Sequence, residues 1–187
     1  PPPPEIGNLP KLKTLNIGHG RLTTLPPELG KLKKLRVLYA DGHELTKLPA
    51  EFKGLSGLRS LSLYDNEFER IPEVILELSD LRGLHLGHNR LSSLSPRIGE
   101  LKSLVSLNLS GNTIDQLPSD IAKLTNLTHL WLNNNYLEEL PVDIGELAGL
   151  KQFEVSGNKL RALPSSITNL ENMIVLDADD NQIVSLP

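Results

Sequence analysis

The chain repeats one pattern every 23 residues, with no insertion along its length. Position 1 of each unit is an apolar residue, at Leu12, Leu35, Leu58, Leu81, Leu104, Leu127, Leu150 and Met173. A fixed period of this size is typical of a stacked repeat array. Because one unit cannot bury its own apolar side, each unit is expected to fold only against its neighbours. Function is therefore expected on a long surface.

Within the period, apolar residues occupy positions 1, 4, 6, 11, 14, 18 and 21, and proline usually occupies position 15. Position 9 is asparagine in the last six units, at Asn66, Asn89, Asn112, Asn135, Asn158 and Asn181. The first two units instead have Gly20 and His43 there. In the fourth unit Ser95 takes the proline position and Pro96 follows, which predicts an altered return turn in that unit.

The consensus LxxLxLxxNxLxxLPxxIxxLxx resembles the leucine-rich repeat family over the whole chain. Its LPxxIxxL half is similar to repeats of plant intracellular Ras-group proteins, Ras-suppressor proteins, Scribble-type polarity scaffolds and bacterial repeat proteins. The resemblance implies an α/β repeat fold, a right-handed curved horseshoe segment. It also implies partner binding on the concave face.

Elementary geometry predicts the same architecture. Alternation around positions 3 to 6 predicts one short strand per unit, with positions 4 and 6 inward and positions 3 and 5 outward. Stacked in register, these strands are parallel and form the concave face. Apolar positions 18, 21 and then 1 recur at period three, which favours 3₁₀ or irregular turns on the convex face. The position-9 amides are expected to form a ladder that satisfies buried backbone groups.

We interpret residues 1–187 as one repeat domain. Residues 1–11 form a partial unit, residues 12–172 form seven full units, and residues 173–187 form a second partial unit. Solenoids normally end in polar capping segments, and neither end of this chain has one. We therefore expect a piece of a longer protein; the alternative is self-association through the uncapped ends.

Composition limits the setting and the partner. The chain has no cysteine and no signal-peptide or membrane-spanning pattern, so we expect a cytoplasmic protein without membrane insertion. The net charge is −4. Residues 1–57 carry nine Lys/Arg against five Asp/Glu, whereas the rest carries ten against eighteen. Basic residues align at position 2 as Lys13, Arg36, Arg59 and Arg82, but they lack the interleaved aromatic residues that single-stranded nucleic acid favours. We therefore expect no nucleic-acid partner.

Tyrosine and tryptophan mark a candidate binding surface, since all three phenylalanines fall at inward positions. Both are enriched in binding hot spots. We expect them to be exposed and to form one patch with their polar neighbours, Trp131 being the dominant anchor. The candidate partner-binding residues are Tyr39, Tyr64, His85, Asn108, His129, Trp131, Asn133, Tyr136, Glu154 and Asp177. The alternative reading is that the aromatic residues only favour strands.

The last units are acidic on this face. Glu154 and Asp177 are expected to be directly adjacent, and like charges on neighbouring strands are destabilising. A partner with a basic segment toward the C-terminal units would relieve that repulsion. The alternative is a solvated surface with screened charges.

Catalysis and metal binding are both disfavoured. Ser62 beside His85, and Asp65 beside His88, supply a nucleophile, bases and a carboxylate, but an open sheet excludes no water and provides no oxyanion donors. A tetrahedral metal site lacks enough ligands. The sequence predicts no enzyme activity, no cofactor and no metal.

Two functional classes remain, with a weaker third. The first is a non-catalytic protein-interaction module, as in a signalling scaffold. The second is a sensory or substrate-recruiting arm of a larger enzyme such as a kinase, a GTPase or a bacterial ubiquitin ligase. The third is glycan binding through Trp131 and Tyr39.

Overall fold

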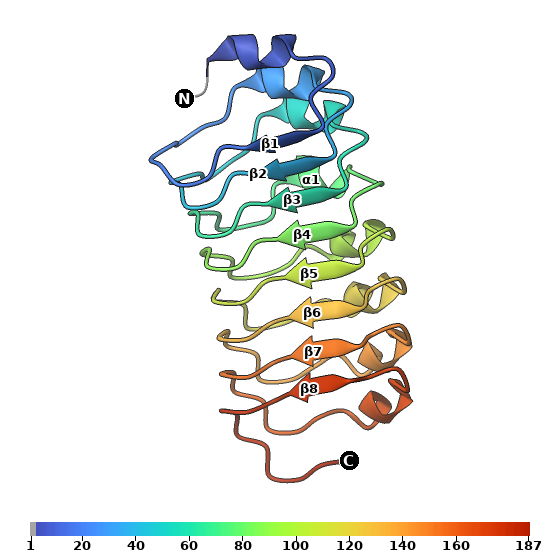
Figure 1. Cartoon of the computed structure of the whole chain (residues 1–187). Helices are drawn as coiled ribbons and strands as arrows, with labels where there is room; N and C mark the ends of the chain where they lie inside the picture. The colour runs from blue at the N-terminus through green and yellow to red at the C-terminus, as the bar shows by residue number, and fades with distance from the viewer. Residues whose placement is uncertain (1–2) are drawn as a thin grey trace.

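A computed structural model describes residues 3–187 as a single stack of similar coils (Figure 1). Pro1 and Pro2, which begin the N-terminal partial unit, lie outside the described residues. One parallel sheet of eight strands runs through this part of the chain in sequence order. The strands are β1 (Thr14–Asn16), β2 (Val37–Tyr39), β3 (Ser60–Ser62), β4 (Gly83–His85), β5 (Ser106–Asn108), β6 (His129–Trp131), β7 (Gln152–Glu154) and β8 (Val175–Asp177).

The strands pair in register, one unit apart. Leu61 pairs with Leu84, and Leu84 with Leu107. Each strand covers positions 3 to 5, so position 4 points into the stack while positions 3 and 5 face outward. The prediction of one short parallel strand per unit is confirmed.

Short 3₁₀ turns form the opposite, convex side, as predicted. They are η1 (Pro4–Asn8), η2 (Pro27–Lys31), η3 (Ala50–Gly54), η4 (Pro96–Glu100), η5 (Ser119–Lys123), η6 (Ile144–Glu146) and η7 (Ser165–Asn169). The third unit instead has one α-helical turn, α1 (Glu73–Leu76). Most of these segments follow a proline in extended conformation, such as Pro118 with φ −67° and ψ 144°.

The prediction of an altered return turn in the fourth unit is wrong. Ser95 adopts φ −65° and ψ 139°, close to the conformation of Pro118, and η4 is an ordinary 3₁₀ turn. The Ser95 hydroxyl also accepts the backbone N–H of Arg97 at 3.3 Å. Serine therefore replaces proline here without changing the path of the chain.

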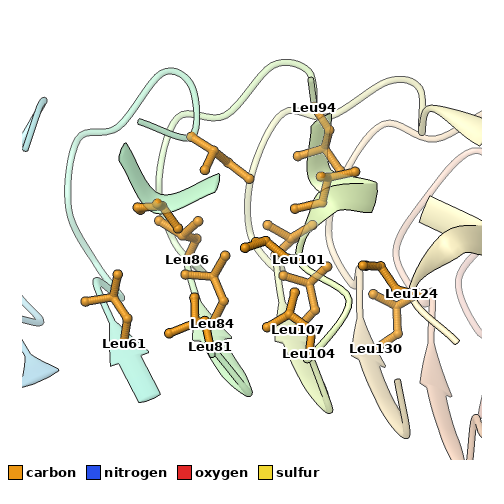
Figure 2. Packing of buried hydrophobic residues seen from close by; sticks show 14 of the residues in the cluster. Leu61, Leu81, Leu84, Leu86, Leu94, Leu101, Leu104, Leu107, Leu124 and Leu130 are labelled. Atoms are coloured by element: carbon orange, nitrogen blue, oxygen red, sulfur yellow. The ribbon is translucent and has the colours of Figure 1, made fainter. Parts of the chain in front are cut away.

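The core is continuous along the stack and consists mainly of leucine. Leucines from successive strands, such as Leu84, Leu107 and Leu130, lie opposite leucines of the return segments such as Leu101 and Leu124 (Figure 2). The three phenylalanines, Phe52, Phe68 and Phe153, are fully buried, as predicted. At the C-terminal end of the stack, Leu186 is 76% exposed, whereas Leu163 at the same position of the preceding unit is 7% exposed.

The asparagine ladder is present. Asn89 illustrates it: its Oδ1 accepts the backbone N–H of Phe68 at 3.0 Å, and its Nδ2 donates to the carbonyls of Leu63, Leu86 and Gly87. The amide thus joins backbone groups of its own and the preceding units, which lie too deep for water to satisfy them.

His43 occupies the ladder position in the second unit. Its Nδ1 accepts the backbone N–H of Leu22 at 3.4 Å, and its Nε2 donates to the Ile17 carbonyl at 2.5 Å. These correspond to two of the four backbone groups that Asn89 contacts, namely Phe68 N–H and the Leu63 carbonyl. A side chain on Gly20 would lie 2.9 Å from the imidazole, so glycine leaves room for the larger ring.

Candidate binding surface

The outward residues of the sheet form a ladder along the concave face. Position 5 pairs in the order Asn16, Tyr39, Ser62, His85, Asn108, Trp131, Glu154 and Asp177. The predicted neighbour relationships are confirmed. Six of the ten candidate residues come from this ladder, which places their side chains on one face.

An aromatic group lies in the middle of this face, and Trp131 is its centre. The ring of Trp131 stacks on His129 of the same strand, with centroids 5.4 Å apart and planes 25° apart. His85 of β4 lies nearby, with its ring centroid 6.3 Å from that of Trp131. Trp131 is half-buried by these neighbours rather than exposed, which corrects the sequence-based expectation. We call His85, His129 and Trp131 the aromatic platform.

The tyrosines are exposed, but their contacts lie elsewhere. Tyr64 packs on His88 with centroids 5.0 Å apart. Tyr136 is 49% exposed, and the Lys159 ammonium lies 4.7 Å from its ring centre. Tyr39 is 38% exposed at position 5 of β2. The aromatic residues therefore occupy several local groups along the face.

The acidic pair at the C-terminal end of the face is adjacent, as predicted, because Glu154 pairs with Asp177. The Glu154 carboxylate accepts hydrogen bonds from Asn133 Nδ2, at 2.8 Å, and from Gln152 Nε2. Asp177 accepts the backbone N–H of Asp179 at 3.1 Å. Neutral donors hold both carboxylates in place, so the two side chains lie at defined positions.

Burial lowers the pKa of His85, while the charge of Asp41 opposes that change. Asp41 lies where strand β2 has ended, and its Oδ1 accepts both the Ser62 hydroxyl at 2.5 Å and the backbone N–H of Tyr64 at 2.9 Å. Asp41 is not among the binding residues predicted from the sequence. Asp41 and Tyr64 both occupy position 7 of their units, 23 residues apart. The repeat pattern could therefore have indicated that the two residues are neighbours.

The Ser62 hydroxyl is not placed to act as a nucleophile. It is only 6% exposed, and its hydroxyl donates to Asp41. Among residues 3–187, no group of three or more His, Asp or Glu side chains is arranged to hold a metal ion.

Gly87 is a second residue that the sequence analysis missed. A Cβ atom there would lie 3.0 Å from the Tyr64 ring, the Asn108 side chain and the Ser110 hydroxyl alike. Glycine therefore allows three outward side chains of the two flanking units to pack against the backbone of residue 87.

No helix in residues 3–187 is long and apolar enough to cross a membrane.

Comparisons with known proteins agree with this geometry. A family model described as leucine rich repeat matches residues 42–91 and 79–137. No curated protein sequence matches the chain.

Solved structures match nearly the whole chain. A leucine-rich repeat protein of Leptospira interrogans is 30% identical, with a TM-score of 0.82 over 98% of this chain and 53% of that one. A TDR receptor is 32% identical, with a TM-score of 0.87 over 97% of this chain and 33% of the receptor.

A third structure is the ectodomain of the Arabidopsis thaliana membrane receptor kinase GASSHO1/SCHENGEN3 in complex with CASPARIAN STRIP INTEGRITY FACTOR 2. It is 31% identical, with a TM-score of 0.77 over 97% of this chain and 26% of that one. The chain thus spans about half of the Leptospira protein and a third or less of the two receptors.

Proposed function

The chain belongs to the leucine-rich repeat family, and we propose that it is a non-catalytic module that binds a protein partner on its concave face. The observation that carries this proposal is the aromatic platform in the middle of the sheet. The ectodomain of GASSHO1/SCHENGEN3, which has a similar fold, was solved with a partner bound. That complex supports the same use for this array.

Trp131 is the proposed anchor. Tryptophan is enriched in hot spots because a large ring removes much apolar surface from water at a small cost in conformational entropy. Stacking on His129 already restricts the Trp131 ring, so binding orders it less. Asn108 and Glu154, its in-register neighbours, supply polar groups around the ring.

The partner is proposed to carry a basic segment toward the C-terminal units. Glu154 and Asp177 lie next to each other there, with Asp179 shortly after them. Because amide donors fix the Glu154 carboxylate, a Lys or Arg side chain of the partner would meet a charge at a defined place. A charged rim of this kind mainly raises the association rate.

We further propose a role in a cytoplasmic signalling scaffold. The alternative is a recruiting arm of a larger enzyme, which the receptor-kinase ectodomain among the similar structures supports. Imaging the tagged full-length protein and sequencing its complete gene distinguish these settings. Self-association through the end units is tested by sedimentation of the purified chain.

The binding test begins with partners captured from lysate on the immobilised chain and identified by mass spectrometry. The best partner is then titrated against the wild type, Trp131→Ala and the convex control Lys123→Ala. We expect Trp131→Ala to weaken binding by about 2 kcal/mol or more, and Lys123→Ala to leave it unchanged. Because Trp131 is half-buried, the unfolding midpoint of each variant is measured first. Normal binding by a folded Trp131→Ala variant, with loss through Lys123→Ala, would reject the concave face as the site.

A further inference from the structure

A second surface lies where the chain passes from the convex turns into the first four strands. We call Lys13, Lys33, Lys34, Arg36, Arg59 and Arg82 the basic edge. Figure 1 shows this passage beside the 3₁₀ turns, at the blunt ends of the strand arrows. We propose that the basic edge docks an acidic protein segment. This proposal concerns residues outside the aromatic platform, so it is independent of the concave-face proposal.

The guanidinium group of Arg36 is held in place by backbone carbonyls. Its Nη1 donates to the Gly57 carbonyl at 3.0 Å and to the Leu35 carbonyl at 3.2 Å. A Cβ atom on Gly57 would lie 1.9 Å from that nitrogen. Glycine at residue 57 is therefore required for Arg36 to lie where it does, and Nε and Nη2 of Arg36 make no hydrogen bond within residues 3–187.

Lys33 is positioned in a similar way. Its Nζ donates to the Gly54 carbonyl at 2.9 Å, and a Cβ on Gly54 would lie 2.8 Å from the same nitrogen. Two of the six cations are thus fixed on backbone carbonyls, Arg36 within its own unit and Lys33 on the next unit. Preorganised cations lose less conformational entropy when they bind an anion.

The basic edge lacks carboxylate partners within the described part of the chain. The ion pairs of residues 3–187 join Arg90 to Glu67, Arg97 to Glu73 and Glu100, Lys123 to Asp120, and Arg161 to Glu138. None of them uses a cation of the edge. Strands β1 to β4 pair in register, so Lys13, Arg36, Arg59 and Arg82 precede directly adjacent strands and repel one another. An acidic partner would remove that repulsion.

The basic residues at position 2 form a stripe that ends after the fourth unit. The corresponding residues of the next two units are Val105 and Thr128. Three strand spacings of about 4.8 Å give the position-2 stripe a length of about 14 Å, which an extended segment of about four or five residues spans. A short stripe of this length fits a short acidic segment.

An acidic protein segment fits this surface better than nucleic acid does. The residues that directly follow the position-2 cations, Thr14, Val37, Ser60 and Gly83, include no aromatic side chain on which a base could stack. The chain is net negative, which opposes a long polyanion that extends past the stripe. Carboxylates match the planar guanidinium groups of Arg59 and Arg82 in paired hydrogen bonds.

The test uses a fluorescein-labelled oligoglutamate peptide of about ten residues, with oligothymidylate of equal length as the competing polyanion. Fluorescence anisotropy gives Kd for the whole chain at several salt concentrations. We expect saturable binding of oligoglutamate at low ionic strength, tighter than that of oligothymidylate, which weakens as salt increases. Reversal of charge in the double variant Arg59→Glu/Arg82→Glu should weaken oligoglutamate binding at least about tenfold.

Gly57→Ala distinguishes binding by positioned cations from binding by net charge alone. It displaces the Arg36 guanidinium without changing any charge, and we expect it to weaken oligoglutamate binding about threefold or more. The matched control is Gly149→Ala at the same repeat position, where a Cβ would meet only the Leu127 and Thr125 carbonyls at ordinary contact distances of 3.4 and 3.5 Å. Circular dichroism and thermal unfolding confirm that each variant is folded.

Three results would overturn the proposal. One is the absence of oligoglutamate binding at low ionic strength. Another is equal binding by the wild type and the folded double variant. The third is tighter binding of oligothymidylate than of oligoglutamate, which would identify the stripe as a nucleic-acid surface. Tryptophan fluorescence of Trp131 checks in the same titration that the aromatic platform is not the site.

Discussion

The imidazole ring of His88 lies directly against the backbone of Gly111, one repeat later. A Cβ atom on Gly111 would lie 3.0 Å from His88 Cδ2, and Gly111 has φ +64°. His88 itself has φ +52°. The same repeat position therefore has a left-handed backbone in both units, and the glycine of one unit leaves room for the ring of the other.

Gly111→Ala is accordingly expected to lower the free energy of unfolding by about 1–3 kcal/mol, because the alanine would be strained and would collide with the ring. Urea unfolding followed by circular dichroism measures this change. Gly149→Ala, where a Cβ has ordinary contacts, serves as the control and should be nearly neutral. Equal stability of the two variants would contradict the proposed steric role of Gly111.

His43→Ala is expected to cost about 1–3 kcal/mol through the loss of its buried hydrogen bonds, with a further cost for the cavity. It would leave the Leu22 N–H and the Ile17 carbonyl without a partner. His43→Asn should retain most of the stability, since asparagine makes the equivalent bonds in later units. If both variants lose the same stability in urea titrations, His43 does not act as a member of the ladder.

Leu107→Ala should cost about 2–5 kcal/mol because it opens a cavity in the middle of the stack. Leu107 is fully buried among the leucines of Figure 2. Its neighbour Ser106 faces outward on β5, so Ser106→Ala should change stability by less than about 0.5 kcal/mol. Thermal and urea unfolding of the pair compare the two faces of one strand, and similar losses would mean that the inward face is misassigned.

The pKa of His85 should lie below its usual value of 6.5 because burial disfavours the charged ring. The unfolded chain then binds more protons than the folded chain between the two pKa values. The free energy of unfolding therefore rises with pH in this range. The contribution of the neutral His85 ring to that free energy is lost as pH falls below about 6.5. NMR titration of the ring gives the midpoint directly.

Asp41→Asn should lower the His85 pKa further, since the Asp41 charge opposes the effect of burial. His85→Gln should flatten part of the dependence of stability on pH below about 6.5. A His85 midpoint at or above 6.5 in the wild type would show that burial does not dominate at this site.

The sequence determined the sheet, the inward face and the asparagine ladder. Apolar residues at fixed positions of an uninterrupted period leave one register in which Leu84, Leu107 and Leu130 can all be buried. The ladder follows from the same period, because Asn89 and its equivalents recur beside backbone groups that water cannot reach. In the candidate site, the period also predicted that Glu154 and Asp177 are neighbours.

Only the tertiary structure decided the conformations that depend on contacts between units. The α-helical turn lies in the third unit, where buried Leu76 occupies the repeat position held by Gly99 in the fourth. A Cβ on Gly99 would lie 2.7 Å from the Asp120 carbonyl, so the room for a side chain there depends on how closely the next turn packs. Likewise, Trp131 is half-buried because His85 and His129 pack beside its ring. A repeat pattern places a residue on a face, but the side chains of adjacent units decide its exposure and its partners.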